Sequence, residues 1–322
     1  MARTTVTKGT ANHTPMLKPK QRLGIRMMKQ WDIQLMVIPA LVLIFIFSYI
    51  PMYGVLIAFQ DYKVGHNFFS NPWVGFKHFE SFFHAPELYT VMRNTIVISL
   101  LKFAIGFPAP IVLALMLNEV RLMFFKRVVQ TITYLPHFMS WVIIGGLVTT
   151  MLSVDIGSVN GVLVGLNLVE EPINFFSIPE YFWTILITTN VWKEIGFASI
   201  VYLAAIAGVD PHLYEAASMD GASRFKQIYL ITLPTIMPVV IIFMILAIGS
   251  LLNAGFEDIL ILATNPGLRS VSDVIDTYVY RIGISNFRFS YATAVGLFKA
   301  VVSVIMLTIA NAIARKSGNS LW

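Results

Sequence analysis

Four side chains suited to binding a polar solute stand within five residues of one another, inside an otherwise apolar run. They are Asn190, Trp192, Lys193 and Glu194. Sugar rings are bound by stacking on aromatic faces and by hydrogen bonds from amide and charged side chains, and this segment supplies both. The pattern predicts a substrate path here. Further candidates for the same path are Tyr202, Asn253 and Phe256. For each lone aromatic residue, helix packing is the alternative role.

Charged side chains interrupt other apolar runs as well. Each costs several kcal/mol at the centre of a bilayer unless it faces protein or water. Lys193 and Glu194 are adjacent, so on a helix they point about 100° apart and need not pair with each other. At least one of them is expected to find a partner on another helix or to face a cavity. Lys102 and Lys299 are expected to be structural or interfacial. An excess of lysine over carboxylate would suit an acidic sugar, although a path for neutral sugars could show it too.

The chain carries no pattern typical of catalysis. It lacks a phosphate-binding P-loop, a nucleophile paired with a base, and metal-ligand spacing. Its six histidines include no pair spaced four residues apart, and cysteine is absent. We therefore predict no catalytic residue, no metal site and no cofactor bound by this chain.

The composition predicts an all-α membrane protein. Apolar residues make up 57% and charged residues 12%, with a mean hydropathy of +0.73; soluble domains carry about twice that charged fraction. Six apolar stretches reach the length of about 20 residues that a bilayer requires. They lie near residues 33–58, 92–117, 132–153, 181–206, 235–254 and 291–314. The first is too long and too far from the N-terminus for a cleavable signal peptide.

Lysine and arginine are distributed unequally between the two sets of loops. Fourteen fall in the segments 1–31, 118–131, 207–234 and 315–322, and five fall in 59–91, 154–180 and 255–290. The positive-inside rule puts the richer set, with both termini, in the cytoplasm. The predicted organisation is a basic tail (1–31), a transmembrane domain (32–315) with a cytoplasmic loop at 207–234, and a short tail (316–322). Nothing supports a nucleic-acid partner for the basic tail.

The loop at 207–234 has the signals of two short helices. Asp210 followed by Pro211 predicts a helix start, because the carboxylate accepts from free backbone N–H groups and proline loses nothing at the first position. Gly221 predicts the end of this helix, since glycine adopts the left-handed conformation without steric penalty. A second helix is expected from about Ala222 until Pro234 stops or kinks it.

This loop resembles the EAA loop of binding-protein-dependent ABC importer permeases. The matching residues are Glu215, Ala216, Ala217, Asp220, Gly221, Ala222, Phe225, Ile228, Ile231, Leu233 and Pro234. The resemblance implies that the loop docks on a separate ATPase and transmits its closure to the spans. ATP and Mg²⁺ would then be bound by partner subunits. The bland alternative is an ordinary helical loop.

Segments outside the loop carry the resemblance further. They include YIPMYGVLIAFQDY (49–62), YLPHFMSWVI (134–143), NVWKEIGF (190–197) and DVIDTYVYRIG (273–283). These are similar to the branch that serves oligosaccharides and polysaccharide fragments, alginate importer permeases among them. The resemblance implies the type I (MetI-like) fold with six transmembrane helices. It also implies a homologous second permease in a heterodimer, two ABC ATPase subunits, an extracytoplasmic solute-binding protein, and a bacterial inner membrane.

Other classes of protein make different predictions. A secondary transporter or channel driven by an ion gradient predicts inverted repeats with matching interruptions in both halves. Pro108 and Pro110 interrupt one span, but no matching interruption is evident in the second half. A membrane-embedded enzyme requires a catalytic constellation, and none is present.

Overall fold

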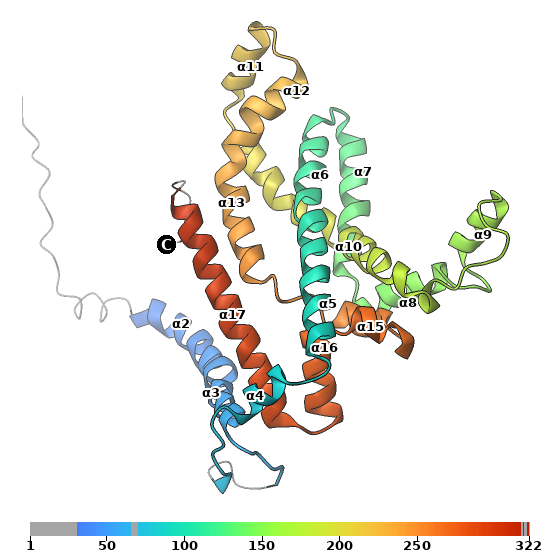
Figure 1. The fold of residues 1–322 in the computed structure, drawn as a ribbon. Helices are drawn as coiled ribbons and strands as arrows, with labels where there is room; N and C mark the ends of the chain where they lie inside the picture. The colour runs from blue at the N-terminus through green and yellow to red at the C-terminus, as the bar shows by residue number, and fades with distance from the viewer. Residues whose placement is uncertain (1–30, 66–69, 317, 319–320, 322) are drawn as a thin grey trace, which may run out of the picture. The chain divides into compact units, whose positions relative to one another are not determined.

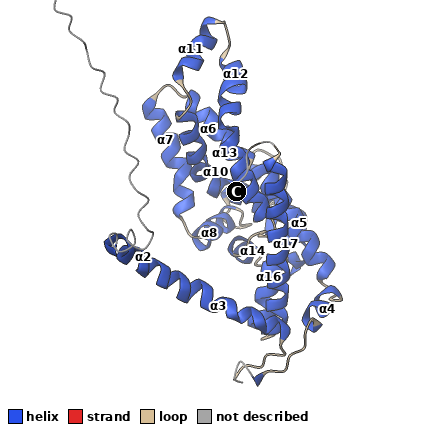
Figure 2. Ribbon diagram, turned by 90° about the vertical axis from the view of Figure 1, so that its left-hand side faces the viewer, coloured by secondary structure: helices blue, strands red, loops and turns tan. Residues whose placement is uncertain are grey.

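The computed structural model describes residues 31–65, 70–316, 318 and 321, so the basic tail lies almost wholly outside the described residues. The chain divides into two units between Gly54 and Val55. Within the described residues the regular structure is helical (Figure 2), and the one β-type contact is a bridge between Gln60 and Trp73. The all-α prediction is confirmed.

The first unit is built from one apolar helix of several segments. These are α2 (Trp31–Ile44), the π-helix η1 (Phe45–Tyr49), α3 (Ile50–Met52) and the start of the 3₁₀ helix η2 (Tyr53–Phe59). Residues Gln34–Phe59 are long and apolar enough to cross a membrane, close to the 33–58 predicted.

The second unit holds the remaining helices (Figure 1). Its first half contains α4 (Lys77–Phe83), α5 (Leu88–Leu101), η4 (Lys102–Gly106), α6 (Pro108–Glu119), α7 (Met123–Tyr134), η5 (Leu135–Phe138), α8 (Trp141–Met151), α9 (Ser158–Gly165) and η6 (Phe175–Ser177). Its second half contains α10 (Pro179–Ala207), α11 (Pro211–Met219), α12 (Arg224–Gln227), η7 (Ile228–Thr232), α13 (Leu233–Gly249), α14 (Glu257–Leu262), η8 (Pro266–Leu268), α15 (Arg269–Ser272), α16 (Ile275–Tyr280), η9 (Arg281–Ser285) and α17 (Phe289–Arg315).

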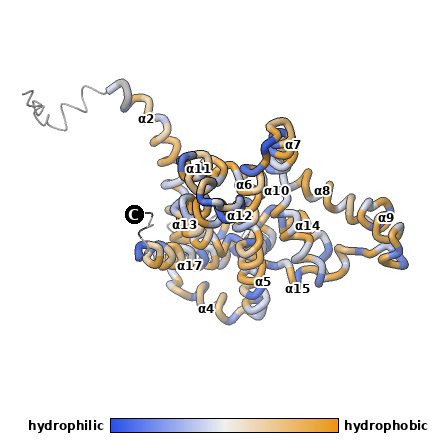
Figure 3. The backbone as a smooth tube through the Cα atoms, turned by 90° about the horizontal axis from the view of Figure 1, so that it is seen from above, coloured by the Kyte–Doolittle hydropathy of each residue, from blue (hydrophilic) through white to orange (hydrophobic). Residues whose placement is uncertain are grey.

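Among the described residues, four helices are long and apolar enough to span a bilayer, and six candidates result if each of two bent pairs counts as one span. Three of the four belong to the second unit: Leu88–Glu119, Arg224–Gly249 and Phe289–Arg315. In Figure 3 the hydrophobic colouring dominates α8, whereas hydrophilic residues gather at α11 and α12. The number of spans therefore agrees with the prediction once the bent pairs are included.

The third predicted span, 132–153, is not one straight helix. Its two parts, Met123–Phe138 and Trp141–Met151, are bent by 107°. Pro136 lacks a backbone N–H, and the helix tightens there and ends, with Met139 in extended conformation. A new helix begins after Ser140, whose Oγ accepts from the N–H of Ile143 at 3.4 Å. Because α7 begins at Met123, most of the predicted cytoplasmic loop 118–131 is also helical.

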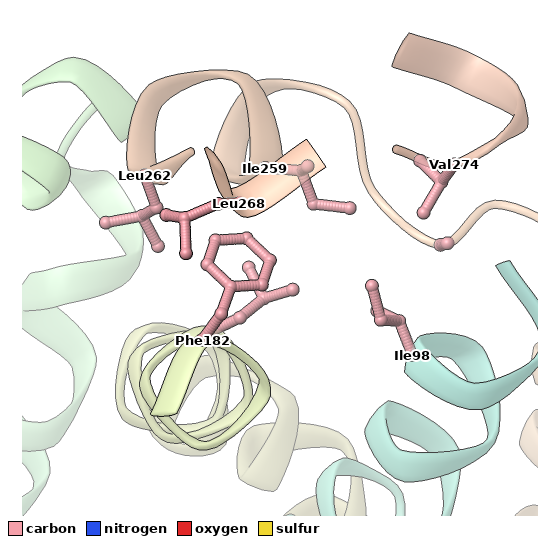
Figure 4. Close-up of a cluster of buried hydrophobic side chains, with 8 residues drawn as sticks. Ile98, Phe182, Ile259, Leu262, Leu268 and Val274 are labelled. Carbon is pink, nitrogen blue, oxygen red and sulfur yellow. The ribbon is translucent and has the colours of Figure 1, made fainter. Parts of the chain in front are cut away.

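Small residues allow the helices to approach closely where they cross. A Cβ at Gly196 of α10 would overlap the backbone carbonyl of Thr133 of α7, so only glycine fits there. A buried cluster joins α5, α10 and the segment from α14 to α16 (Figure 4). Its members include Ile98, Phe182, Ile259, Leu262, Leu268 and Val274, all at most 1% exposed. This cluster fixes the loop-rich region from 250 to 275 against the long helices.

Candidate coupling site and substrate path

Residues 210–234 form a bent pair of helices, here called the coupling knob, at one end of α10 and α13 (Figure 1). Asp210 begins α11: its carboxylate accepts from the N–H of His212 at 2.9 Å, as predicted. Gly221 ends the helix at φ +75°. The N–H groups of Gly221 and Ala222 donate back to the carbonyls of Ser218 (3.1 Å) and Ala217 (2.9 Å). This is the Schellman pattern, which satisfies carbonyls at a helix end.

The sequence predicts one of two effects of Pro234 on the second helix of the knob, to stop it or to kink it. The helix does not stop or break there; Arg224–Gly249 is continuous and long enough to span a bilayer. The five residues Ile228–Thr232 form a π-helical turn immediately before the proline. A π-bulge shifts the hydrogen-bond register, and Leu233 donates to the carbonyl of Ile228 across it. The coupling knob is thus joined to α13 by continuous helix.

Polar contacts tie the two helices of the knob together from the inside. The buried Gln227 donates through Nε2 to Ser218 Oγ at 2.9 Å and to the carbonyl of Ala222 at 3.2 Å. The hydroxyls of Tyr214 and Thr232 lie 2.9 Å apart. These bonds join α11 to the segment formed by α12 and η7.

The outer surface of the knob is left open. Glu215 is exposed, and its one polar side-chain contact in the described chain is with His212, at 3.3 Å. Met219 is 90% exposed and Phe225 79%. The remaining residues of the predicted docking set are exposed or half-buried: Ala216, Ala217, Asp220, Gly221, Ala222 and Pro234. The outer surface of the knob thus presents a carboxylate beside exposed apolar side chains.

The second candidate region lies halfway along α10. Glu194 Oε2 is 2.7 Å from His137 Nδ1, and its Oε1 is 3.2 Å from Lys193 Nζ. Lys193 is buried and also donates to the carbonyl of His137 at 2.9 Å. His137 belongs to η5, directly before the bend between α7 and α8. Lys193 and Glu194 thus do pair, and both also find the predicted partner on another element; we call His137, Lys193 and Glu194 the central polar cluster.

Aromatic rings surround the central polar cluster. The ring of His137 stacks on Phe197 with centroids 3.9 Å apart, and Lys193 Nζ lies 5.4 Å from the centre of the Trp141 ring. Glu194 keeps 40% of its side chain exposed. An exposed carboxylate beside aromatic faces is suited to hydrogen-bonding a sugar hydroxyl.

The other predicted path residues do not all gather at this cluster. Asn190 is half-buried, and Trp192 is 42% exposed beside an apolar groove of about 480 Å³ between α8 and α10. Tyr202 is 5% exposed within a core cluster with Ile206 and Ile236, so its ring packs between helices. Helix packing, the alternative role, describes Tyr202 in this chain.

Asn253 and Phe256 lie in a non-helical segment between α13 and α14, held by a buried ion pair. Lys102 donates to the carbonyl of Ala254 at 2.7 Å and pairs with Asp258. Gly255 sits between the pair at φ +119°, where a Cβ would overlap both side chains. Lys102 falls near the middle of the span Leu88–Glu119, and irregular backbone at membrane depth occurs where protein or a water-filled cavity surrounds it.

The lysines of the spans were expected to bind the carboxylates of an acidic sugar, but in the structure they are already paired. Lys102 pairs with Asp258, Lys193 with Glu194, and Lys299 with Asp276. Each positive charge is therefore compensated within the chain, which removes that argument for an acidic substrate. It confirms a structural role for Lys102 and Lys299.

Sequence reasoning missed the partners of these lysines. His137 is 56 residues from Lys193, and Asp258 is 156 residues from Lys102. A usable signal was present, because each isolated lysine in an apolar run implies a carboxylate elsewhere. The chain offered several carboxylates, and only the fold selects among them.

With this geometry established, comparison with known proteins assigns the family. Residues 106–318 match the family described as the binding-protein-dependent transport system inner membrane component. The chain belongs to this family. It is 46% identical over 301 residues to YteP of Bacillus subtilis (strain 168), a polygalacturonan/rhamnogalacturonan transport system permease protein. That alignment covers 93% of this chain and 92% of YteP.

Comparison with solved structures leads to the same family. A chain of a bacterial ABC transporter involved in the import of the acidic polysaccharide alginate superposes with a TM-score of 0.84 at 42% identity, covering 92% of this chain and 99% of that chain. A chain of the bacterial alginate ABC transporter in complex with an alginate pentasaccharide-bound periplasmic protein also gives 0.84, at 41% identity, covering 93% and 99%. The permease has the type I ABC importer fold, as predicted. The gradient-driven transporter is the alternative that these matches do not support.

Proposed function

We propose that this permease imports uronic-acid oligosaccharides across a bacterial inner membrane, together with a homologous second permease, two ABC ATPase subunits and a solute-binding protein. Both termini and the coupling knob face the cytoplasm in this proposal. The distribution of lysine and arginine between the loops supports that orientation.

The observation that carries the proposal is the coupling knob. It is rigid inside, through Gln227 and Tyr214, and open outside, at Glu215 and Phe225. A partner that moves such a knob also moves α13, because the helix continues from Arg224 to Gly249. This supports mechanical coupling to a separate ATPase that binds ATP and Mg²⁺.

The relatives support the class of cargo. Galacturonan, named for YteP, and alginate, named for the solved structures, are both polymers of sugar acids. The periplasmic protein bound in one of those structures supports delivery by a binding protein. In this chain, Glu194 and the aromatic rings near it supply groups for sugar hydroxyls and ring faces, so we infer that the path passes the central polar cluster.

Reconstitution tests the proposal. The chain is placed in proteoliposomes with its homologous permease and ATPase subunits, and uptake of labelled galacturonate and alginate oligosaccharides is measured with the loaded binding protein. We expect uptake that requires ATP and the ATPase subunits and is insensitive to ionophores. Uptake by the permeases alone, driven by an ion gradient, would contradict the proposal. Uptake limited to neutral oligosaccharides would support an ATP-driven importer but refute uronic-acid oligosaccharides as its substrate.

A further inference from the structure

A polar cavity of about 290 Å³ lies among α14, η8, α15, α16 and η9, away from the central polar cluster. Its walls combine hydroxyl, amide, guanidinium and aromatic groups. Those residues are Thr264, Asn265, Arg269, Tyr280, Arg281 and Ser285. Pockets for small molecules have volumes of about 300–1,000 Å³, so this cavity suits a single sugar unit rather than a long chain.

Arg269 is a cation available to an incoming ligand. Its side chain is exposed and makes no hydrogen bond or ion pair with any described residue. The three lysines of the spans differ, since each is paired with a carboxylate. A guanidinium presents two parallel N–H groups to a carboxylate, so Arg269 can bind an acid bidentately.

The carboxylate already in this cavity is compensated by the protein. Asp273 pairs with Arg281, and the Thr277 hydroxyl donates to its Oδ1 at 2.9 Å. Its charge therefore does not cancel that of Arg269. The wall that faces a ligand keeps a net positive charge.

The backbone that presents Arg269 is held firmly. Leu268 and Val274, on either side of α15, are at most 1% exposed in the cluster of Figure 4. Trp183 Nε1 donates to the carbonyl of Val271 at 2.8 Å, and Arg93 Nη2 donates to that of Ser270, also at 2.8 Å. The position from which the Arg269 side chain extends is therefore fixed by the fold.

An aromatic contact links the cavity to the predicted path. The ring of Tyr280, 41% exposed, lies 5.2 Å from that of Phe256, one of the path residues named from the sequence. Tyr280 thus offers a surface for a sugar ring between the cavity and the segment held by Lys102.

We propose that this cavity is a subsite for one uronate unit, with Arg269 binding its carboxylate and Tyr280 packing against its ring. The inference rests on the proposed import of acidic oligosaccharides and adds a location at which acidity is recognised. Of the other wall groups, the exposed Ser285 offers a hydroxyl to the sugar, whereas the amide of Asn265 already accepts from the N–H of Gly267 at 2.9 Å.

Equilibrium binding of trigalacturonate to the purified, nucleotide-free complex tests the subsite. We expect Arg269→Gln to raise its Kd by about tenfold, the usual effect of losing a charge-assisted hydrogen bond. The Kd of Arg269→Lys should lie between those of the unaltered complex and of Arg269→Gln. The matched control is Arg288→Gln. Arg288 is an exposed arginine of the same segment between the spans, and its guanidinium lies over the ring of Tyr291. The methyl ester of trigalacturonate, which has no charge, should bind the unaltered complex as weakly as the acid binds Arg269→Gln.

Four results would overturn the inference. They are unchanged binding by Arg269→Gln, an equal loss in Arg288→Gln, equal affinity for acid and ester, and no binding of the acid by the unaltered complex. The uptake assay of the proposed function, run on the same unaltered complex, shows separately whether acidic oligosaccharides are imported. Normal ATP-dependent uptake with unchanged binding by Arg269→Gln would refute the subsite alone.

Discussion

The coupling knob and the membrane-depth ion pairs handle polar groups in opposite ways. The knob leaves Glu215 in solvent, and its one polar side-chain contact among the described residues is with a histidine three residues away. The pair of Lys102 and Asp258 is buried, at 15% and 4% side-chain exposure, and joins segments 156 residues apart. Exposed charges retain their hydration, whereas a charge at membrane depth is tolerated only with a partner. The knob therefore leaves a charge exposed to the proposed partner subunit, whereas the ion pairs join distant segments of the chain.

The largest effect is expected from breaking the buried pair. Asp258→Ala leaves Lys102 uncompensated, which costs about 3–5 kcal/mol. Thermal unfolding of the purified complex should show a large drop in Tm. The exposed Asp155→Ala is the control and should leave Tm unchanged. The double variant Lys102→Met, Asp258→Leu should recover most of the loss; if Asp258→Ala alone is harmless, the pair does not stabilise the fold.

Altering the turn of the knob should come next. Proline requires φ near −65°, and Gly221 is at +75°. Gly221→Pro should reduce ATP-dependent uptake by about a hundredfold, or roughly 2.7 kcal/mol, while the chain still inserts in the membrane. Gly65→Pro, also at a positive φ but in the loop between η2 and α4, should transport nearly normally. Normal uptake by Gly221→Pro would show that the turn of the knob is not needed for coupling to ATP hydrolysis.

A change in the central polar cluster should have an intermediate effect, measured on the KM for the substrate. Glu194→Gln removes the charge beside His137 and Lys193 and should raise the KM for uptake by about tenfold. Glu180→Gln changes an exposed glutamate at the start of the same helix and serves as the matched control. Equal KM values in the two variants would exclude Glu194 from the path.

Loosening the inside of the knob should have a smaller effect. Gln227→Met removes two hydrogen bonds, to Ser218 and Ala222, at nearly constant volume. We expect uptake to fall several-fold, with more ATP hydrolysed per solute moved, because about 1–2 kcal/mol of internal bonding is lost. A measured ratio of hydrolysis to transport equal to that of the unaltered complex would show that knob rigidity is unimportant.

The smallest effect is expected at the exposed pair on the knob. His212 and Glu215 keep 84% and 72% of their side chains exposed. Pairs of this kind contribute little, so His212→Ala should leave Tm unchanged. A clear fall in Tm would mean that the open face of the knob also stabilises the chain.

The sequence by itself determined the helical class, the approximate positions of the spans, and the start and turn of the knob. These depend on neighbours: apolar length decides a span, and Asp210 and Gly221 act through backbone groups within a few residues. The tertiary structure decided the rest. The bend after Pro136, the helix that continues past Pro234, the burial of Tyr202 and the partners of Lys102, Lys193 and Lys299 all depend on what lies across the helix packing. A lysine in an apolar run requires a partner, but the choice among distant carboxylates is made only when the helices meet.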